Sequence, residues 1–321
     1  MRKRKQALIL LGPQREQPTV AGTCTDLEAA GRLSKGAPIA TISAGWQERE
    51  AELTPLETDL GRPVVDLGLY ARAETLAAVD LDLAAGHKAA QRRLKELRRA
   101  YNLRLAGLMS TSVSLETMEG DEEVLAPERE DALEAIRRLD TRHLGRVADI
   151  RAEYDGAFRP HERDEVARNR EEIAGLLADV DVVAIAGGHV ATLLNRLRLF
   201  GVDRLLGDRT IVAWSAGAMA LGERVILFHD SPPWGPGNAE AFENGLGLVQ
   251  GLIPFPHASR RLALDDCPRI GRLARRFAPD VCALLDPGVR LERVADRWVG
   301  AGDAYRLDTS GGTQLLASRA A

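Results

Sequence analysis

The sequence predicts an α/β protein with a doubly wound, mostly parallel sheet, a long helical insertion and a small C-terminal antiparallel meander. Three observations lead to this fold class. Short apolar runs alternate with helix-compatible stretches before residue 70 and again after residue 180. A segment rich in Arg, Glu, Ala and Leu, without strand-like runs, lies between them. Short strand-like runs separated by turn residues follow residue 280.

The parallel strands are predicted from continuous apolar runs, because a strand covered by helices on both faces is apolar throughout. Gly61, directly after Leu60, ends the helix expected between the second and third runs. We expect strands at 7–12, 37–45, 63–69, 180–186, 210–214 and 223–228.

Residues 74–178 are predicted to form a helical insertion within a single domain that spans residues 1–321. Apolar residues recur there at helical spacing, as in Leu133, Ile136 and Leu139. We expect two or three long helices with a break between residues 109 and 127. The three histidines of the insertion lie among charged residues and are predicted to be solvated; they are His87, His143 and His161.

After His257 the sequence predicts one helix and then the antiparallel meander. Turn dipeptides such as Pro287-Gly288 separate the runs of this meander. The runs are 281–285, 289–294, 297–300 and 304–308.

Composition and charge exclude several classes of function. A formal net charge of −4 gives no general attraction to nucleic acid or to an anionic membrane. Three cysteines without C-x-x-C spacing argue against a disulfide framework and a zinc site, and no dinucleotide motif indicates a cofactor. No run approaches the roughly 20 apolar residues of a membrane span, and the N-terminal apolar run is too short for a signal peptide. We therefore expect a cytoplasmic protein without a metal or cofactor.

The stretch TIVAWSAGA at 210–218 carries the strongest chemical signal. A strand that ends at Trp214 leads directly into Ser215 and then into a helix of small residues. Ala213 and Gly217 flank the serine at −2 and +2, a relaxed form of the G-x-S-x-G elbow in which strand and helix backbones come close. Taken alone, the pattern fits a structural turn equally well.

A nucleophilic serine needs a base, an acid that orients the base, and backbone amides that stabilise the oxyanion. His257 follows the apolar run LIPFP and is the candidate base. Asp230, just after the 223–228 run, is the candidate orienting carboxylate, with Glu240 and Glu243 as alternatives.

A glycine pair, Gly187 and Gly188, ends the 180–186 run. Ligands in open α/β sheets bind at the carboxyl ends of strands, where such glycines expose backbone amides. A simple tight turn explains the pair equally well when it is considered by itself.

In the order GGH, WSAGA, HD and PH, these motifs resemble those of the peptidase E and cyanophycinase family of serine hydrolases. The segment GLGLVQGLIPFPH at 245–257 is similar to the GLGL segment that precedes the family's histidine. The resemblance is good over 180–308 and holds only in pattern before residue 70. It implies a class I glutamine amidotransferase-like, flavodoxin-like fold.

The resemblance also implies roles for individual residues. Ser215 would be the nucleophile, His257 the general base and Asp230 its orienting partner. The backbone amides of Gly188 and Ala216 would form the oxyanion hole. The implied reaction is hydrolysis of an amide bond in a small peptide through an acyl-enzyme.

The family's substrates imply an acidic residue on the acyl side, and Arg260 or Arg261 would pair with its carboxylate. His189 stands where the family has Asn, and is therefore a further candidate for substrate binding. Ala213 stands where the family has Gly. The insertion has no counterpart in the family. Three roles remain open for it: it would cover the site, form a homo-oligomer contact or bind a partner.

Other hypotheses remain beside serine hydrolysis. A catalytically silent family member would work as a binding or scaffold protein through its helical insertion. An α/β-hydrolase esterase shares the order Ser, acid, His, but the chain after His257 is too long and too rich in strands for that fold. A serine at the elbow excludes a cysteine-dependent amidotransferase, whose chemistry needs a thiolate.

Overall fold

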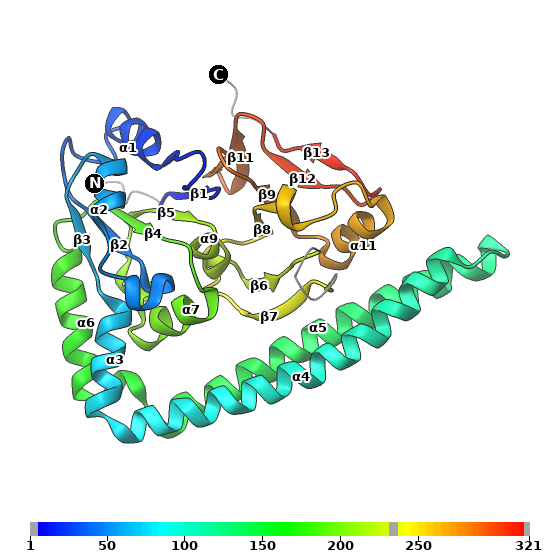
Figure 1. Cartoon of the computed structure of the whole chain (residues 1–321), viewed down its shortest axis with the longest axis horizontal. Helices are drawn as coiled ribbons and strands as arrows, with labels where there is room; N and C mark the ends of the chain where they lie inside the picture. Colours follow the sequence, from blue (N-terminus) through cyan, green and yellow to red (C-terminus); the bar gives the residue numbers. More distant parts are fainter. Residues whose placement is uncertain (1–5, 231–236, 318–321) are drawn as a thin grey trace.

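A seven-stranded sheet forms the centre of the computed structural model, which describes residues 6–230 and 237–317. Its order is β11-β10-β1-β5-β4-β2-β3, and the five strands from β1 to β3 in this order are parallel (Figure 1). The predicted mixed α/β fold with a mostly parallel sheet is therefore confirmed. These five strands are β1 (Leu8–Leu11), β5 (Thr210–Trp214), β4 (Val182–Ile185), β2 (Ile39–Ile42) and β3 (Val64–Asp66).

Helices cover both faces of this sheet, which explains why its strands are apolar throughout. Successive residues of a strand point to opposite faces. Leu8 and Leu10 accordingly belong to one buried cluster, and Ile9 and Leu11 belong to the other. One face packs against α1 (Val20–Ala29) and α2 (Thr54–Leu60). The other packs against α3 (Leu69–Val79), α6 (Asp164–Leu177), α7 (Val190–Leu199), α8 (Val202–Leu205) and α9 (Ala216–Leu221).

The 223–228 run does not join the parallel sheet, and this part of the prediction was wrong. β6 (Arg224–Leu227) instead pairs antiparallel with β7 (Glu240–Asn244) in a separate two-stranded sheet. The connection from β5 to β6 holds only Ser215, α9 and two further residues. It is shorter than the dozen or so residues that a parallel crossover needs.

The prediction of a single C-terminal antiparallel meander was also wrong, because its strands are divided between two sheets. β10 (Arg290–Val294) and β11 (Arg297–Ala301) form a hairpin that extends the central sheet beside β1. The remaining strands form a four-stranded sheet in which β8 and β9 are parallel. That sheet contains β8 (Leu252–Pro256), β9 (Val281–Leu285), β12 (Tyr305–Leu307) and β13 (Thr313–Leu315).

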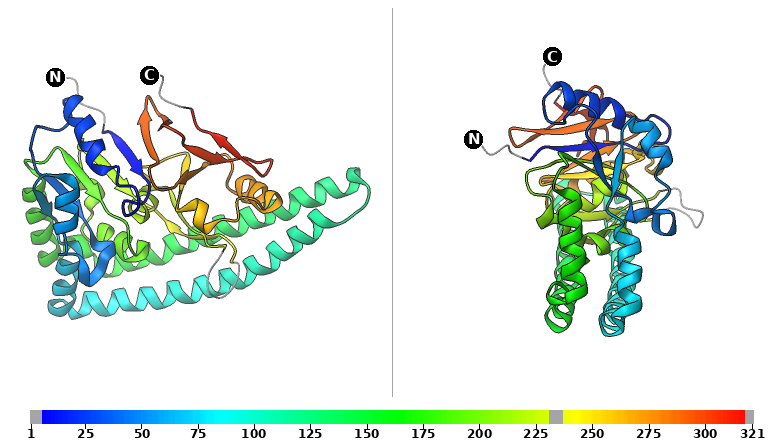
Figure 2. Two further views of the ribbon diagram at one scale, coloured as in Figure 1. Left: turned by 45° about the horizontal axis from the view of Figure 1, so that its top comes forward. Right: turned by 90° about the vertical axis from the view of Figure 1, so that its left-hand side faces the viewer.

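Two long antiparallel helices, α4 (Leu81–Thr117) and α5 (Glu122–Phe158), form an arm that runs along the body and extends past it (Figures 1 and 2). Asp80 caps the first helix through Leu83 N, and Asp121 caps the second through Glu123 N. Thirty-seven residues per helix correspond to about 55 Å. The break between them is shorter than predicted, at residues 118–121.

A buried polar cluster ties the arm to the body. Arg276 donates to both carboxylate oxygens of Asp140 at 2.7 Å, and Tyr101 donates to the same carboxylate at 2.8 Å. The amide of Ala241 in β7 donates to the Tyr101 hydroxyl at 3.0 Å. The cluster thus joins α4, α5, β7 and α11 (Cys267–Phe277).

The histidines of the arm are less solvated than predicted. His143 is buried, and its ring stacks on Tyr101 with 4.1 Å between ring centroids. Burial lowers the pKa of His143, and it lowers the pKa of the half-buried His87 to about 4. The adjacent Lys88 and Arg142 are exposed, while the imidazoles face the packed side of the helices.

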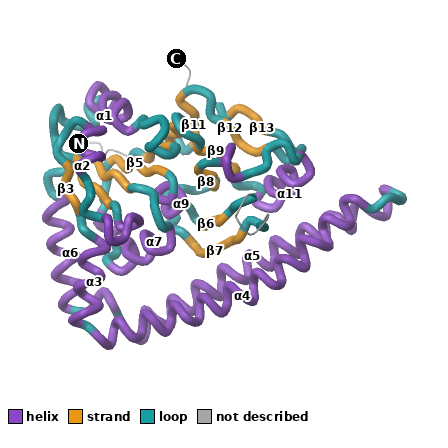
Figure 3. Tube along the Cα trace, in the orientation of Figure 1, coloured by secondary structure: helices purple, strands orange, loops and turns teal. Residues whose placement is uncertain are grey.

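The arm consists of two helices joined by a short loop, whereas the strands lie in the body together with the other helices (Figure 3). Within the described ranges, no helix is both long enough and apolar enough to cross a membrane.

Candidate active site

Ser215 lies at a sharp bend between β5 and α9. Its backbone has φ 51° and ψ −122°, a strained conformation for a residue with a side chain. A Cβ added to Gly217 would lie 2.3 Å from the carbonyl oxygen of Ile185, and one added to Gly187 would lie 2.8 Å from the Ser215 Cβ. The small neighbours of Ser215 are therefore needed because two strand ends and a helix meet there.

The glycine turn after β4 lies directly against this bend. Gly188 has φ 110°, and a Cβ there would lie 2.3 Å from the carbonyl oxygen of Gly45. Gly188 and Ala216 both line the same pocket as Ser215. Within the described part of the chain, neither of their amides donates a hydrogen bond, so both are available to an oxyanion.

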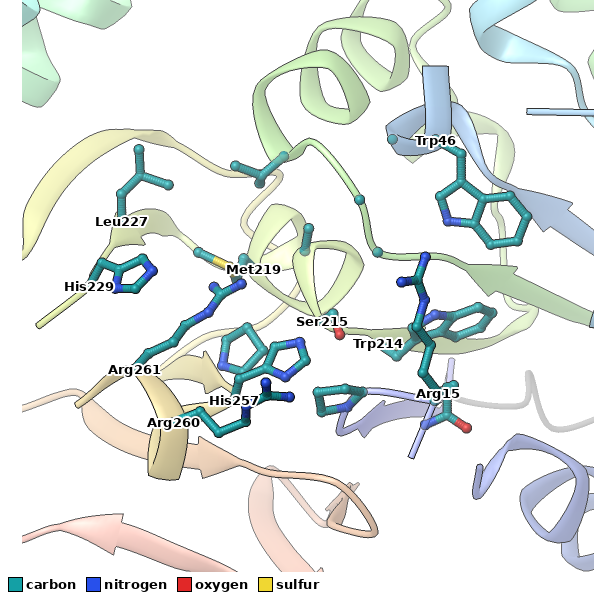
Figure 4. A pocket seen from close by; sticks show the side chains of 18 of the residues that line it. Arg15, Trp46, Trp214, Ser215, Met219, Leu227, His229, His257, Arg260 and Arg261 are labelled. Atoms are coloured by element: carbon teal, nitrogen blue, oxygen red, sulfur yellow. The ribbon is translucent and has the colours of Figure 1, made fainter. Parts of the chain in front are cut away.

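His257 follows β8 in the left-handed conformation, with φ 58°, at the start of the short helix α10 (Ala258–Arg261). Its amide donates to Leu285 O at 3.1 Å, which fixes the residue at the end of the β8–β9 pair. The side chain is half-buried and lies beside Ser215 in the pocket (Figure 4). Burial, followed by the charges of Arg261 and Arg260, lowers the pKa of His257.

Asp230 is directed elsewhere. One of its carboxylate oxygens accepts from Arg269, and the other accepts from the amide of Ala263 at 3.1 Å. It lines a small second pocket rather than the one that contains Ser215. The structure therefore does not bring Asp230 to His257.

The two alternative acids have partners on the arm. Glu240 lines the pocket and accepts from Arg98 Nε at 2.8 Å. Glu243 is buried and accepts from Arg151 at 2.7 Å and from Arg198. Neither carboxylate forms a hydrogen bond with His257 among the described residues.

Asp286 is a further acid near His257, although no hydrogen bond joins the two among the described residues. It follows β9 directly, and β9 lies parallel to β8 with Leu285 opposite Pro256. Its oxygen accepts from the amide of Ser259 at 3.0 Å and from the Ser259 hydroxyl at 2.9 Å. Two acids raise the pKa of His257 against the effect of burial: first the exposed Glu16, and then Asp286. Sequence reasoning missed Asp286; its only signal there was a buried run followed by Asp-Pro-Gly.

The predicted substrate-binding residues differ in their surroundings. Arg260 is largely exposed and pairs with Glu16 at 2.5 Å. Arg261 is half-buried, has no carboxylate partner among the described residues and lies 5.8 Å from the ring centroid of Phe228. Burial, and then Arg260, lowers its pKa. His189 caps α7 through Thr192 N at 3.2 Å and does not line the pocket.

The pocket around Ser215 has a volume of about 1240 Å³, above the range of about 300–1,000 Å³ that is usual for small-molecule sites. One side is formed by residues such as Arg15, Trp46 and Trp214 (Figure 4). The opposite side is formed by Leu227, His229 and Arg261, with Ser215 and His257 between the two.

Comparisons with known proteins agree with this description. The model of peptidase family S51 matches residues 156–284. A crystal structure of a peptidase from an acI-B1 actinobacterium shares the fold, with a TM-score of 0.50 and 14% identity over 99% of this chain and 96% of that one. A putative peptidase E from Listeria monocytogenes has a TM-score of 0.42 and 12% identity over 94% and 99% of the two chains. No curated protein sequence matches this chain. Over residues 156–284, which include both Ser215 and His257, the chain is similar to peptidase family S51, in agreement with the resemblance found in the sequence.

Proposed function

We propose that this peptidase hydrolyses an amide bond in a small peptide through an acyl-enzyme on Ser215, with His257 as general base. One observation carries the proposal: a serine held at positive φ at the end of a parallel strand faces a histidine in the same large pocket. Burial keeps that histidine neutral near pH 7, as a base must be. We also propose that the fold is of the class I glutamine amidotransferase-like type.

In the first step the Ser215 oxygen attacks the amide carbonyl carbon while His257 takes the hydroxyl proton. The amides of Gly188 and Ala216 stabilise the negative oxygen. His257 then gives the proton to the leaving amine as the C–N bond breaks. Water attacks the resulting ester with His257 again as base, which releases the acid and restores Ser215.

Asp286, in place of Asp230, is the third member of this triad in our proposal. Its position at the end of β9 supports this role, since it stabilises the imidazolium that forms during each proton transfer. Asp230 is held by Arg269 and supports the loop before α11.

We further propose an acidic residue on the acyl side of the substrate, bound by Arg261. Burying a guanidinium without a carboxylate partner costs free energy, and a substrate carboxylate would supply the missing partner of Arg261. Arg260 is already paired with Glu16 at the surface and is the weaker candidate. We also propose that the protein is located in the cytoplasm. We propose further that residues 1–321 form a single domain with the helical insertion at 74–178.

Ser215→Ala tests this function. The variant is expected to lose hydrolysis of aspartyl and isoaspartyl peptides and covalent labelling by a fluorophosphonate probe, because Ser215 is the only hydroxyl nucleophile among the described residues that line the pocket. Ser110→Ala, on the exposed face of the arm, is the matched control and should keep both. Full activity of Ser215→Ala would overturn the mechanism. A wild-type protein that is neither labelled nor active would favour the silent scaffold instead.

A further inference from the structure

Arg98 reaches the active-site pocket from the helical arm. It belongs to α4, yet it lines the same pocket as Ser215 and His257. Two contacts with β7 hold it there: its Nε donates to Glu240 Oε2 at 2.8 Å, and its guanidinium lies 5.0 Å from the ring centroid of Phe242. The arm thus forms part of the wall of the site.

The contacts of Arg98 leave its terminal nitrogens free. Among the described residues only Nε has a partner, and Arg98 is 39% exposed. A planar guanidinium held at Nε and against a ring presents its remaining N–H groups in a fixed direction, which suits a carboxylate.

Arg261 lies at the same end of the β6–β7 pair. Leu227 is opposite Glu240 in the register of that pair, and the ring that Arg261 approaches, Phe228, is the next residue. Arg98, Arg261 and Glu240 all line the pocket there. Two guanidinium groups against one carboxylate leave one positive charge, which a single ligand carboxylate would balance.

We propose that Arg98 and Arg261 together form a carboxylate subsite, in which Glu240 positions Arg98 and the helical arm supplies the second guanidinium. This inference rests on the proposed function, since it assigns a second residue to the recognition of the acidic substrate. It also gives the insertion a role, because its first long helix completes the specificity pocket. The carboxylate is either an acidic side chain or the peptide's C-terminus.

Peptide binding to Ser215→Ala tests the subsite without turnover. Calorimetry would compare an Asp peptide with its Asn analogue, and a free C-terminus with its amide. Adding Arg98→Ala should weaken binding of the carboxylate peptide by about 10- to 100-fold, the effect of one charge-assisted pair, and leave its neutral analogue unchanged. Arg98→Lys should restore part of the preference. Arg93→Ala, which removes a surface pair with Glu153 on the same arm, should change neither peptide.

Arg98→Ala should abolish the difference in affinity within one of the two peptide pairs. Loss of the Asp–Asn difference would identify an acidic side chain as the ligand, and loss of the acid–amide difference would identify the C-terminus. If Arg98→Ala weakens charged and neutral peptides equally, or neither, the subsite is refuted. If discrimination depends on Arg98 but the wild-type protein hydrolyses no peptide, the subsite stands and the proposed hydrolysis falls.

Discussion

At the scale of single residues, the proposed mechanism requires His257 to be neutral before it can act as a base. Burial and two neighbouring arginines lower its pKa, so the imidazole is neutral at pH values where a free histidine would be charged. Glu16 and then Asp286 act in the opposite direction and favour the cation. In the proposed mechanism, this balance keeps His257 neutral while still allowing it to accept the Ser215 proton.

Asp286→Asn is expected to shift the acid limb of kcat/KM to lower pH. Asp286 raises the pKa of His257, so its neutralisation lowers that pKa and keeps the imidazole neutral further into acid. The maximal kcat should fall by about 10²- to 10⁴-fold, because the developing imidazolium loses its partner. Full pH–rate profiles of the variant would measure both effects.

Asp230→Asn is the control for this experiment, and its acid limb should coincide with that of the wild type. If the acid limb of kcat/KM shifts in Asp230→Asn and not in Asp286→Asn, Asp230 rather than Asp286 is the third member of the triad.

At the scale of elements, the bend that carries Ser215 depends on the close approach of β4, β5 and α9. Gly217 is the first-turn residue of α9 that faces the end of β4. Its missing side chain lets the helix begin directly after the serine. The strain at Ser215 is held by this packing rather than by the serine itself.

Gly217→Ala should lower the free energy of unfolding by about 1–3 kcal/mol and reduce kcat/KM, because the new methyl meets the Ile185 carbonyl at 2.3 Å. Gly107→Ala is the matched control in an exposed helical position with open space around it. That change should instead stabilise by about 0.5–1 kcal/mol. Urea unfolding of both variants makes the comparison; equal effects would argue against a crowded bend.

At the scale of the whole molecule, the most deeply buried ion pair between the arm and the body joins Asp140 to Arg276 among the described residues. Their side chains are 4% and 1% exposed, so each charge depends on the other. Removing one partner of such a pair is far more costly than removing a surface pair. This attachment also sets where α4 delivers Arg98 to the pocket.

Asp140→Ala should therefore destabilise the protein by about 3–5 kcal/mol, since the guanidinium of Arg276 remains buried without its carboxylate. Glu153→Ala breaks the exposed pair with Arg93 and should cost no more than about 1 kcal/mol. Chemical denaturation followed by circular dichroism measures both. A loss below 1 kcal/mol in Asp140→Ala would show that the cluster does not hold the arm.

The local sequence signals identified most of the fold but not its assembly. The predicted bounds of β5, 210–214, agree with the structure. The bend at Ser215 was predicted from the small residues around the end of that strand. The 223–228 run was recognised as a strand but assigned to the wrong sheet, because an apolar run records burial and not its partner. The burial of His143 was missed since its neighbours in the sequence are charged.

The sequence by itself determined the alternation of strands and helices, the long helical segment and the bend at Ser215, since each depends on residues near one another in the chain. Only the tertiary structure decided that Asp286, and not Asp230, lies near His257 and that Arg98 lines the pocket. Both depend on pairings between distant segments, β8 with β9 and α4 with β7, whose register local periodicity does not encode.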